Sequence, residues 1–465
     1  MTTTFSAVVT TGIYCRDGCS AHPNPRNVRS YSYAAAAEAD GFRACLRCRP
    51  YRSPGPDPWI GGTELVCRAV RLVLDGALDD GDEQQLAARV GVSARHLRRL
   101  FQEHVGATPD EVARSRRAHF ARRLLDETDL PVAHIGFAAG FSSVRQMNRV
   151  MREVFHDSPS GLRARRRSRD RLVADGGLDL RLAFRPPLAW DAIVARLARH
   201  ACPGVEAVEP DVYRRTIEID GHPGVIELHR PVEPDHLRLR VHLPRWEGLI
   251  HVVDQARRVF DLDADPAPIA DALGHDPLLA PSVEACPGMR VAGAWDPFES
   301  AVRVVLGQQV GVRSANTFAG RLVERLGTPV PGLAAFGLTH CFPDSATVAK
   351  ADLEGIGLTG ARAATVQALA TAVATGDVVL DGARALDETV QALVTVPGVG
   401  AWTAQCIAMA CGERDAFPAG DLGLRRAAST SDPLIAIGEL ETRAEAWRPW
   451  RAYAAAHLWR LATTP

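Results

Sequence analysis

The feature that most constrains the fold of this chain is a set of four cysteines in two close pairs near its amino end. Cys15 and Cys19 form the first pair, and Cys45 and Cys48 form the second. Two close pairs of thiols are what a tetrahedral zinc site requires, and such a site holds together a segment too short for a core of its own. We therefore predict one Zn²⁺ held by these four residues. The six other cysteines are scattered and are expected to be small buried side chains, not disulfides.

The residues that surround the cysteines carry further information. Residues 10–16 (TTGIYCR) and 41–50 (GFRACLRCRP) resemble the metal-binding domain of the Ada family, although the segment ahead of Cys15 is shorter than in that family. The resemblance implies that Cys15 accepts a methyl group from a methylphosphotriester in DNA. Methylation of a zinc-bound thiolate would remove one negative charge and so weaken its repulsion from DNA phosphates. A purely structural zinc site is the alternative.

Length and charge set the wider limits. A chain of 465 residues is too long for one core, so several domains are expected. No apolar run reaches the roughly 20 residues of a membrane-spanning helix, and we expect a bacterial cytoplasmic, nucleoid-associated protein with no membrane partner. The net charge of −1 conceals an asymmetry, because residues 1–170 contain 26 Arg against 19 Asp or Glu. A basic front half is typical of proteins that bind nucleic acid, although a solvated charged face is the simpler explanation.

From residue 59 to about residue 167, apolar residues recur at helical spacing. Residues 85–101 predict a helix, a glycine turn, an N-cap at Ser93 and a second helix with an apolar stripe, and residues 132–149 repeat the pattern. Two such units resemble the DNA-binding domains of the AraC family, which implies promoter DNA and RNA polymerase as partners. A plain helical bundle with solvated arginines is the alternative. The residues expected to contact DNA are Arg95, His96, Arg98, Arg99, Arg145, Gln146, Asn148 and Arg149.

The second half of the chain changes character twice. Residues 190–200 predict an amphipathic helix, while residues 215–219, 225–229 and 237–241 predict strands separated by turn residues. From residue 296 onward the pattern is again helical and is broken by turns that contain glycine and proline. The sequence therefore predicts a mixed α+β segment followed by a helical one.

A short hairpin motif in the helical segment points to DNA. In residues 396–404 (VPGVGAWTA), the turn residues Pro397, Gly398, Val399 and Gly400 are expected to bind a DNA phosphate through backbone amides. Asp421 follows at the spacing found in the helix-hairpin-helix DNA glycosylase superfamily. Residues 295–299, 306–310 and 447–459 resemble the AlkA, or 3-methyladenine glycosylase, branch, and the resemblance covers roughly residues 180–465.

The resemblance implies roles for individual residues. In that family the aspartate that matches Asp421 stabilises the oxocarbenium ion and orients or deprotonates water, and an N-cap is its alternative role. Trp402 and Trp459 are candidates to stack on the flipped base, and Gln309 matches the wedge that fills its place. Strand-cutting relatives carry a lysine at position 402, but the only lysine here is Lys350, so a monofunctional enzyme without a cofactor for this reaction is expected.

Three positions depart from the AlkA pattern. Gln309 is polar where AlkA has an apolar wedge, a pocket tyrosine position falls on Cys406, and the residue after Trp459 is Arg460. These departures bear on the range of lesions and not on the reaction. Core packing is the alternative for the tryptophans, and it is the expectation for Trp450.

The predicted fold class is multidomain, mainly α with α+β parts. Its domains are a small zinc-binding α/β methyl-acceptor domain (1–52), an all-α AraC-type double helix-turn-helix domain (59–168), an α+β (TBP-like) domain (178–286) and an all-α helix-hairpin-helix glycosylase domain (287–465). The predicted function is hydrolysis of the N-glycosidic bond of alkylated purines in double-stranded DNA, fused to an alkylation-responsive regulator that acts as a monomer. A transcriptional regulator whose glycosylase half is inactive and only binds DNA is the alternative.

Overall fold

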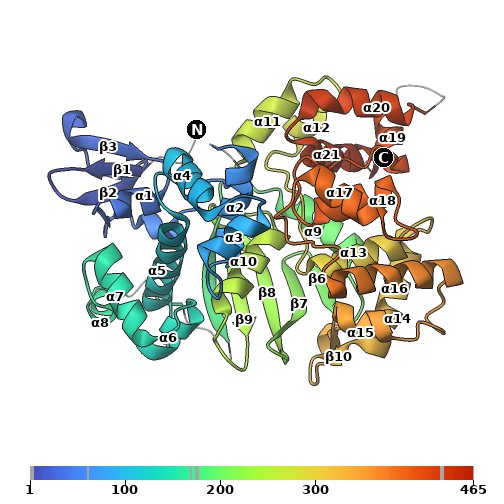
Figure 1. The fold of residues 1–465 in the computed structure, drawn as a ribbon, viewed down its shortest axis with the longest axis horizontal. Helices are drawn as coiled ribbons and strands as arrows, with labels where there is room; N and C mark the ends of the chain where they lie inside the picture. Colours follow the sequence, from blue (N-terminus) through green and yellow to red (C-terminus); the bar gives the residue numbers. More distant parts are fainter. Residues whose placement is uncertain (1–4, 60–61, 168–169, 173–176, 430–433, 464–465) are drawn as a thin grey trace. The chain divides into compact units, whose positions relative to one another are not determined.

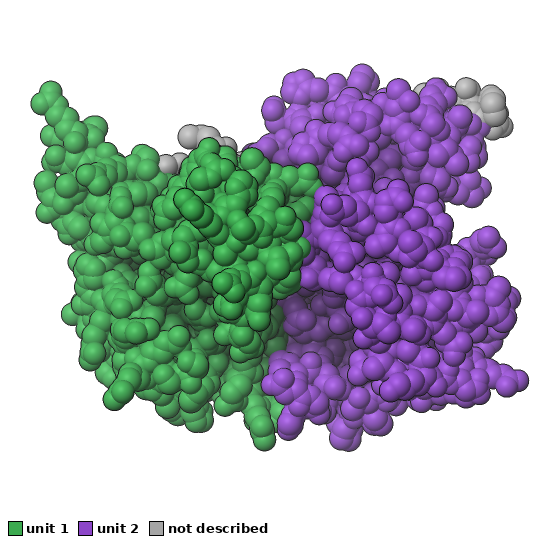
Figure 2. Space-filling model, in the orientation of Figure 1, with its two compact units in different colours: residues 1–184, 238–254 green, residues 185–237, 255–465 purple. Residues whose placement is uncertain are grey.

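The computed structural model describes residues 5–59, 62–167, 170–172, 177–429 and 434–463. The chain forms two compact units (Figures 1 and 2). Unit 1 contains residues 1–184 and 238–254, and unit 2 contains residues 185–237 and 255–465. Most of the elements are helices, and the strands form a four-stranded, a five-stranded and a two-stranded sheet. The predicted mainly α class with α+β parts is therefore confirmed.

The amino-terminal part of unit 1 is a four-stranded sheet in the order β3-β1-β2-β4. Strand β1 runs antiparallel to both β2 and β3, while β2 and β4 are parallel. The strands are β1 (Phe5–Val8), β2 (Ile13–Arg16), β3 (Val28–Tyr31) and β4 (Arg43–Ala44), and they are followed or interrupted by η1 (Pro25–Asn27), α1 (Ala34–Ala39) and η2 (Pro50–Arg52). Because Cys15 lies on β2 and Cys45 directly follows its neighbour β4, the sheet brings the two cysteine pairs together.

Residues 64–164 of unit 1 are helical. Its helices are α2 (Glu64–Leu74), α3 (Glu83–Arg89), α4 (Ala94–His104), α5 (Pro109–Glu127), α6 (Val132–Ala138), α7 (Val144–Phe155) and α8 (Pro159–Ala164). Helix α5 contacts α1, α2, α6, α7 and α8 and forms the centre of this part (Figure 1). Its start is set locally, since Thr108 and Glu111 form a capping box and Pro109 occupies the first turn. Strand β5 (Leu178–Ala183) also belongs to unit 1, and β9 (His236–His242) is its neighbour in the sheet.

A buried carboxylate on α5 anchors the segment that follows the cysteines. Asp126 is fully buried, and it accepts hydrogen bonds from the hydroxyl of Tyr51 at 3.0 Å and from Nη2 of Arg52 at 2.9 Å. Arg49 lies 3.3 Å from the same carboxylate, and Arg122, one turn back on α5, lies 2.7 Å from it. Charges this deep need partners, so these contacts fix the cysteine-bearing segment to α5.

Unit 2 begins with the predicted mixed segment. Strands β6 (Glu206–Glu209), β7 (Val212–Ile219) and β8 (His222–Glu233) form an antiparallel run next to α9 (Trp190–Arg199). The helix predicted over 190–200 and the strand predictions within 215–219, 225–229 and 237–241 are therefore confirmed, with longer strands than expected. The boundary between the units falls within β9 and again within α10 (Leu249–Val259).

Most of the remaining elements of unit 2 are helices. They are α11 (Pro266–Gly274), α12 (Ala280–Ala285), α13 (Pro297–Leu306), α14 (Val312–Leu326), β10 (Thr328–Pro329), η4 (Ala334–Phe336), β11 (His340–Cys341), α15 (Ser345–Lys350), α16 (Gly360–Thr375), α17 (Leu386–Val394), α18 (Ala401–Ala410), α19 (Leu422–Ala428), α20 (Ile437–Ala444), η5 (Glu445–Trp447) and α21 (Arg451–Thr463). Cys202 and Val205, between α9 and β6, share one buried core with Val305 of α13 and Ile407 of α18. Among the described helices, none is long and apolar enough to cross a membrane.

Candidate functional site

The turn between α17 and α18 has the hairpin form that its two glycines predict. Gly398 has a φ of +86°, and a Cβ added there would lie 2.0 Å from Oγ1 of Thr365 on α16, so only glycine fits. Pro397, Gly398 and Gly400 are exposed, while Val399 is buried with a 5% exposed side chain. The side chain of Val399 therefore anchors the turn in the core. Among the described residues no side chain caps α18, which leaves its first amides available to a phosphate.

Asp421 lies at the start of α19 and accepts hydrogen bonds from three elements. Its Oδ1 accepts from the backbone N–H of Leu424 at 3.1 Å and from Nε1 of Trp459 at 2.9 Å. Its Oδ2 accepts from Nε1 of Trp402 at 3.4 Å. The carboxylate is thus an N-cap and is also held between the two tryptophans that the sequence proposes for the base pocket. The structure brings these three residues of α18, α19 and α21 together.

Trp459 reaches Asp421 because Gly423 leaves room for it. A Cβ on Gly423 would lie 3.0 Å from Oδ1 of Asp421 and 3.3 Å from Cδ1 of Trp459, tighter than nearly all contacts of that kind. A larger residue there would push the indole away from the carboxylate. Trp450, which is expected in the core, is buried at 6% exposure and stacks against Arg414.

A cation that the sequence analysis missed lies beside this carboxylate. The guanidinium carbon of Arg196, on α9, lies 4.5 Å from the ring centroid of Trp459. Burial lowers the pKa of Arg196, and the charge of Asp421 opposes that effect. Burial, with the charge of Asp421, raises the pKa of Cys406 to about 12, so that thiol stays neutral. The amphipathic pattern of residues 190–200 indicates a helix but does not indicate which of its arginines faces the site.

The predicted wedge, Gln309, lies in the turn after α13. It is exposed and has a φ of +54°, a left-handed conformation that is rare for a residue with a side chain. Its neighbour Gln308 fixes the turn, because Nε2 of Gln308 donates to the carbonyl of Gly398 at 3.0 Å and to Oγ1 of Thr403 at 2.9 Å. Arg362 donates to the carbonyl of Gln308 at 2.5 Å. Gln308 therefore ties the wedge turn to the hairpin, a role that sequence analysis did not assign.

The four cysteines near the amino end form the predicted metal-binding cluster. The Sγ atoms of Cys15, Cys19, Cys45 and Cys48 all lie within 4.8 Å of one another. In a tetrahedron with Zn–S bonds of about 2.3 Å the sulfurs are roughly 3.8 Å apart, so the cluster fits Zn²⁺. Burial and the neighbouring Cys45 raise the pKa of the Cys15 thiol, and a bound cation is what would hold it as a thiolate.

The residue next to the predicted methyl acceptor connects the sheet to α5. The hydroxyl of Tyr14 donates to Oε1 of Glu38 at 2.6 Å, and Nε2 of His119 lies 2.7 Å from the same oxygen. Tyr14 lies on β2 beside Cys15, Glu38 lies on α1 and His119 lies on α5. The three side chains hold the cysteine-bearing strand against the central helix of unit 1.

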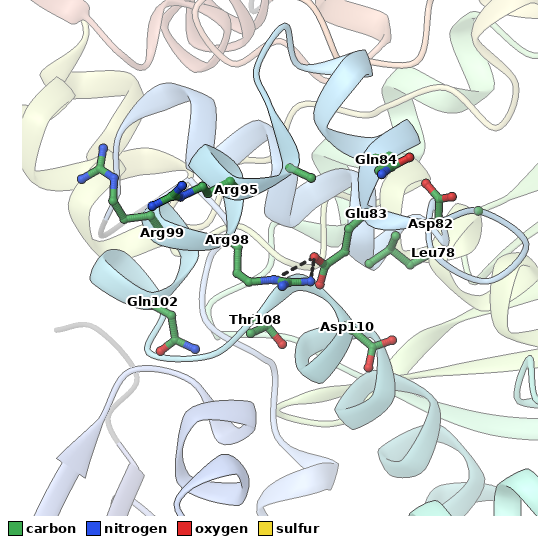
Figure 3. Close-up of a pocket in the computed structure, with 12 residues that line it drawn as sticks. Leu78, Asp82, Glu83, Gln84, Arg95, Arg98, Arg99, Gln102, Thr108 and Asp110 are labelled. Atoms are coloured by element: carbon green, nitrogen blue, oxygen red, sulfur yellow. Dashed lines mark hydrogen bonds and ion pairs between the residues drawn. The ribbon is translucent and has the colours of Figure 1, made fainter.

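The first predicted DNA-reading helix, α4, presents the expected side chains. Leu97 and Phe101 are fully buried, while Arg95, His96, Arg98 and Arg99 are exposed. A groove between α3, α4 and the start of α5 is lined by Arg95, Arg98, Arg99 and Gln102 and by the acidic residues Asp82, Glu83 and Asp110 (Figure 3). The side chain of Arg98 points to Glu83 and pairs with it at 2.5 Å. Glu83 therefore accepts from Nε and Nη2 of Arg98 in this structure.

The second predicted DNA-reading helix, α7, has the same arrangement. Met147 and Val150 are buried, while Arg145 and Arg149 are exposed and Asn148 is half-buried. Gln146 is engaged locally, because its Oε1 accepts from the backbone N–H of Ser142 at 2.9 Å and from its hydroxyl at 3.0 Å. The sequence expects Gln146 to contact DNA, but here its amide oxygen closes the start of α7.

Comparison with known families matches all four parts of the chain. The metal binding domain of Ada matches residues 2–51, and a helix-turn-helix domain matches residues 86–165. The AlkA N-terminal domain matches residues 179–296, and the HhH-GPD superfamily of base excision DNA repair proteins matches residues 302–452. The resemblances found in the sequence are confirmed.

Individual relatives extend this result to the whole chain. The chain is 42% identical to a probable bifunctional transcriptional activator/DNA repair enzyme AlkA of Mycobacterium tuberculosis, over 99% of this chain and 93% of that protein. It is 30% identical to DNA-3-methyladenine glycosylase 2 of Escherichia coli, over 60% of this chain and 95% of that protein.

A solved structure supports the fold of the second half. The 3-methyladenine DNA-glycosylase of Archaeoglobus fulgidus matches with a TM-score of 0.53 and 22% identity, over 61% of this chain and 97% of that one. The surroundings of Asp421, the cysteine cluster and the relative from Mycobacterium tuberculosis all point to the same two-part protein. The chain belongs to the family of bifunctional transcriptional activators and DNA repair enzymes, in which an Ada-type regulator is fused to an AlkA-type DNA glycosylase.

Proposed function

We propose that Asp421 drives hydrolysis of the N-glycosidic bond of alkylated purines of the 3-methyladenine type in double-stranded DNA. The observation that carries this proposal is the carboxylate of Asp421, held between the indoles of Trp402 and Trp459 by hydrogen bonds from both. A carboxylate fixed in this way stabilises positive charge on the sugar as the bond to the base breaks. Similarity to DNA-3-methyladenine glycosylase 2 of Escherichia coli supports the substrate class.

The reaction needs no group beyond water and these side chains. The C1′–N bond breaks with its electron pair leaving on the base, and water adds to C1′ as a proton passes to Asp421. The indoles of Trp402 and Trp459 offer electron-rich faces that attract a cationic base by about 0.5–2 kcal/mol. Gln309, in its exposed turn, would fill the place that the base leaves, and the amides after Gly400 would hold a phosphate.

The enzyme is proposed to be monofunctional and to leave an abasic site. Strand cleavage by a Schiff base needs a lysine at position 402, and this chain has Trp402 there. The only lysine in the sequence is Lys350, at the end of α15. Intact strands after base release, cut only by added alkali, would be the product.

Unit 1 is proposed to be the sensor and regulator. Its four cysteines would hold one Zn²⁺, which supplies charge that keeps Cys15 a thiolate at neutral pH. The Sγ of Cys15 would attack the methyl carbon of a methylphosphotriester, so that an S–C bond forms, the C–O bond breaks and a phosphodiester anion leaves. The exposed side chains of α4 and α7 would then bind promoter DNA, with the chain acting as a monomer that contacts RNA polymerase.

Substitution of the carboxylate tests the catalytic proposal. Asp421→Asn keeps an oxygen to accept from Leu424 and Trp459 but loses the charge, so we expect base release to fall by at least about 10²-fold with the fold intact. The measurement is release of 3-methyladenine or 7-methylguanine from methylated duplex DNA. The exposed Asp387→Asn on α17 is the control. Unchanged release by Asp421→Asn would refute the mechanism, and no release by the wild type would favour a regulator that only binds DNA.

A further inference from the structure

The face of Trp459 is already occupied by a cation from another part of unit 2. The guanidinium of Arg196 lies over this indole with its carbon 4.5 Å from the ring centroid, while the indole nitrogen bonds to Asp421. Trp459, Asp421 and Trp402 come from the helical segment, but Arg196 lies on α9, in the α+β segment that precedes it. The proposed base site therefore has a neighbour that the hairpin motif does not include.

Arg196 also differs from Arg215, another arginine that lies over a tryptophan. Within the part of the chain that the structure describes, the side chain of Arg196 makes no hydrogen bond or ion pair, and the ring of Trp459 is its one specific contact. Arg215, by comparison, lies over Trp295 and pairs with Glu299 at 2.7 Å. The N–H donors of Arg196 are thus held at the pocket without a protein acceptor, and a guanidinium carries five such donors and no acceptor.

We propose that Arg196 is a specificity-determining residue that favours neutral purines with free acceptor atoms over cationic purines. This inference rests on the proposed function. A cationic base and the Arg196 guanidinium compete for the same indole face and repel each other in a half-buried site, where charges interact more strongly than in water. A neutral purine instead presents ring nitrogen or carbonyl acceptors to the unpaired N–H groups of Arg196. Arg196 therefore offsets part of the attraction that Trp402 and Trp459 have for alkylated cations.

Two lesions distinguish the repulsion of a cationic base from hydrogen bonding to a neutral one. Hypoxanthine and 7-methylguanine share the acceptor at O6 but differ at N7, which is a free acceptor in hypoxanthine and is methylated, with a positive charge on the ring, in 7-methylguanine. The 2-amino group of 7-methylguanine is a further difference, and comparison of each variant with the wild type on the same two duplexes controls for it. The test compares single-turnover release of the two bases from duplexes of the same sequence by the full chain. Arg196→Met removes the charge and the donors at similar length. Arg199→Met, on the same helix and exposed, is the matched control.

We expect Arg196→Met to raise release of 7-methylguanine and lower release of hypoxanthine, so that the ratio of the two rates changes by about tenfold or more. Arg199→Met should leave the ratio unchanged. Arg196→Lys keeps the charge and should keep the ratio near that of the wild type, and it keeps the test decisive if Arg196→Met unfolds. A ratio that is unchanged in Arg196→Met, or that collapses equally in Arg196→Lys, would overturn the role of charge. Release of neither base by the wild type would overturn the proposed function and this inference together, whereas release of both with an unchanged ratio overturns this inference alone.

Discussion

The carboxylate of Asp421 depends on three separate elements for its orientation. Its own helix supplies the N–H of Leu424, α18 supplies Trp402 and α21 supplies Trp459. The bonds from Leu424 and Trp459 have ordinary lengths and that from Trp402 is long at 3.4 Å, but together they limit rotation of the side chain. A reacting group that is already in position costs no reorganisation at the moment of reaction. At the scale of single residues, this is what the packing of unit 2 contributes to the chemistry.

A buried histidine on α21, the helix that also carries Trp459, makes the free energy of unfolding depend on pH. His457 on α21 is 3% exposed, and its Nδ1 lies 3.0 Å from Oγ of the buried Ser282. Burial, with the charge of Arg460, lowers the pKa of His457 to about 4. An unfolded chain takes up a proton here below about pH 6.5, but the folded protein does not do so until about pH 4. As the pH is lowered from about 6.5 to about 4, the free energy of unfolding should therefore fall, by up to about 1.4 kcal/mol per pH unit from this residue.

The measurement is the urea midpoint of the full chain at pH 7 and at pH 5. In His457→Gln we expect a smaller drop between the two pH values than in the wild type, because one proton-binding difference has been removed. His275→Gln changes an exposed histidine and should keep the wild-type drop. An equal drop in all three proteins would show that His457 is not responsible.

At the scale of elements, helix α5 holds the zinc-binding sheet and the helix-turn-helix units in one body. His119 faces Glu38 and Tyr14, and Asp126 faces Tyr51 and Arg52, so polar contacts along α5 bind the segments on both sides of the cysteines. Buried pairs of this kind are costly to form but far more costly to break on one side. Helix α5 is therefore the element on which the regulator half depends most.

Removal of the Asp126 carboxylate tests that dependence. Asp126→Ala removes the carboxylate that pairs with the fully buried Arg122 at 2.7 Å, and we expect it to lower the free energy of unfolding of unit 1 by about 3–5 kcal/mol. Asp129→Ala is the matched control, because Asp129 pairs with Arg166 at 2.8 Å but its side chain is 48% exposed. That change should cost under about 1 kcal/mol. The measurement is a urea titration followed by circular dichroism, and similar losses for the two variants would contradict the importance of burial.

At the scale of the whole molecule, the two chemistries belong to different units. The cysteine cluster and the two helices predicted to read DNA lie in unit 1, while Asp421, the hairpin and the tryptophans proposed for the base pocket lie in unit 2. Each unit has buried apolar residues of its own, so we expect that loss of one proposed active centre leaves the other in place. Damage sensing and base removal can therefore be separated by experiment within one chain.

Zinc removal provides that separation. We expect a chelator to abolish methyl transfer to Cys15 and to unfold the segment around the cluster, because such small segments depend on the metal. Base release by unit 2 should remain within about twofold of the untreated protein, since its proposed mechanism uses no metal. The measurements are zinc content, mass of the Cys15 peptide after exposure to methylated DNA, and base release. Cys45→Ser should mimic the chelator, whereas Cys341→Ser, at a buried cysteine of unit 2, should keep the zinc; loss of base release together with zinc would contradict this division.

Local patterns in the sequence are enough to predict the parts of this protein. Ligand count and spacing indicate the zinc cluster, helical periodicity indicates α4 and α7, and the glycine hairpin with Asp421 indicates the glycosylase. These signals are local because a metal site, a helix face and a tight turn each depend on residues a few positions apart. The predicted helix over 190–200 and the observed α9 accordingly agree to within one residue.

Only the tertiary structure decided which side chains meet across long stretches of chain. Arg196 lies over Trp459, and Gln308 bonds to the hairpin. Arg98 pairs with Glu83, and the side chain of Gln146 accepts from Ser142. A periodic pattern indicates that a residue lies on the polar face of its helix, but not which neighbour lies opposite, because that depends on how the elements pack. The sequence by itself therefore indicated the roles proposed for Asp421 and Cys15, and the packing of elements within each unit decided which charges and donors surround them.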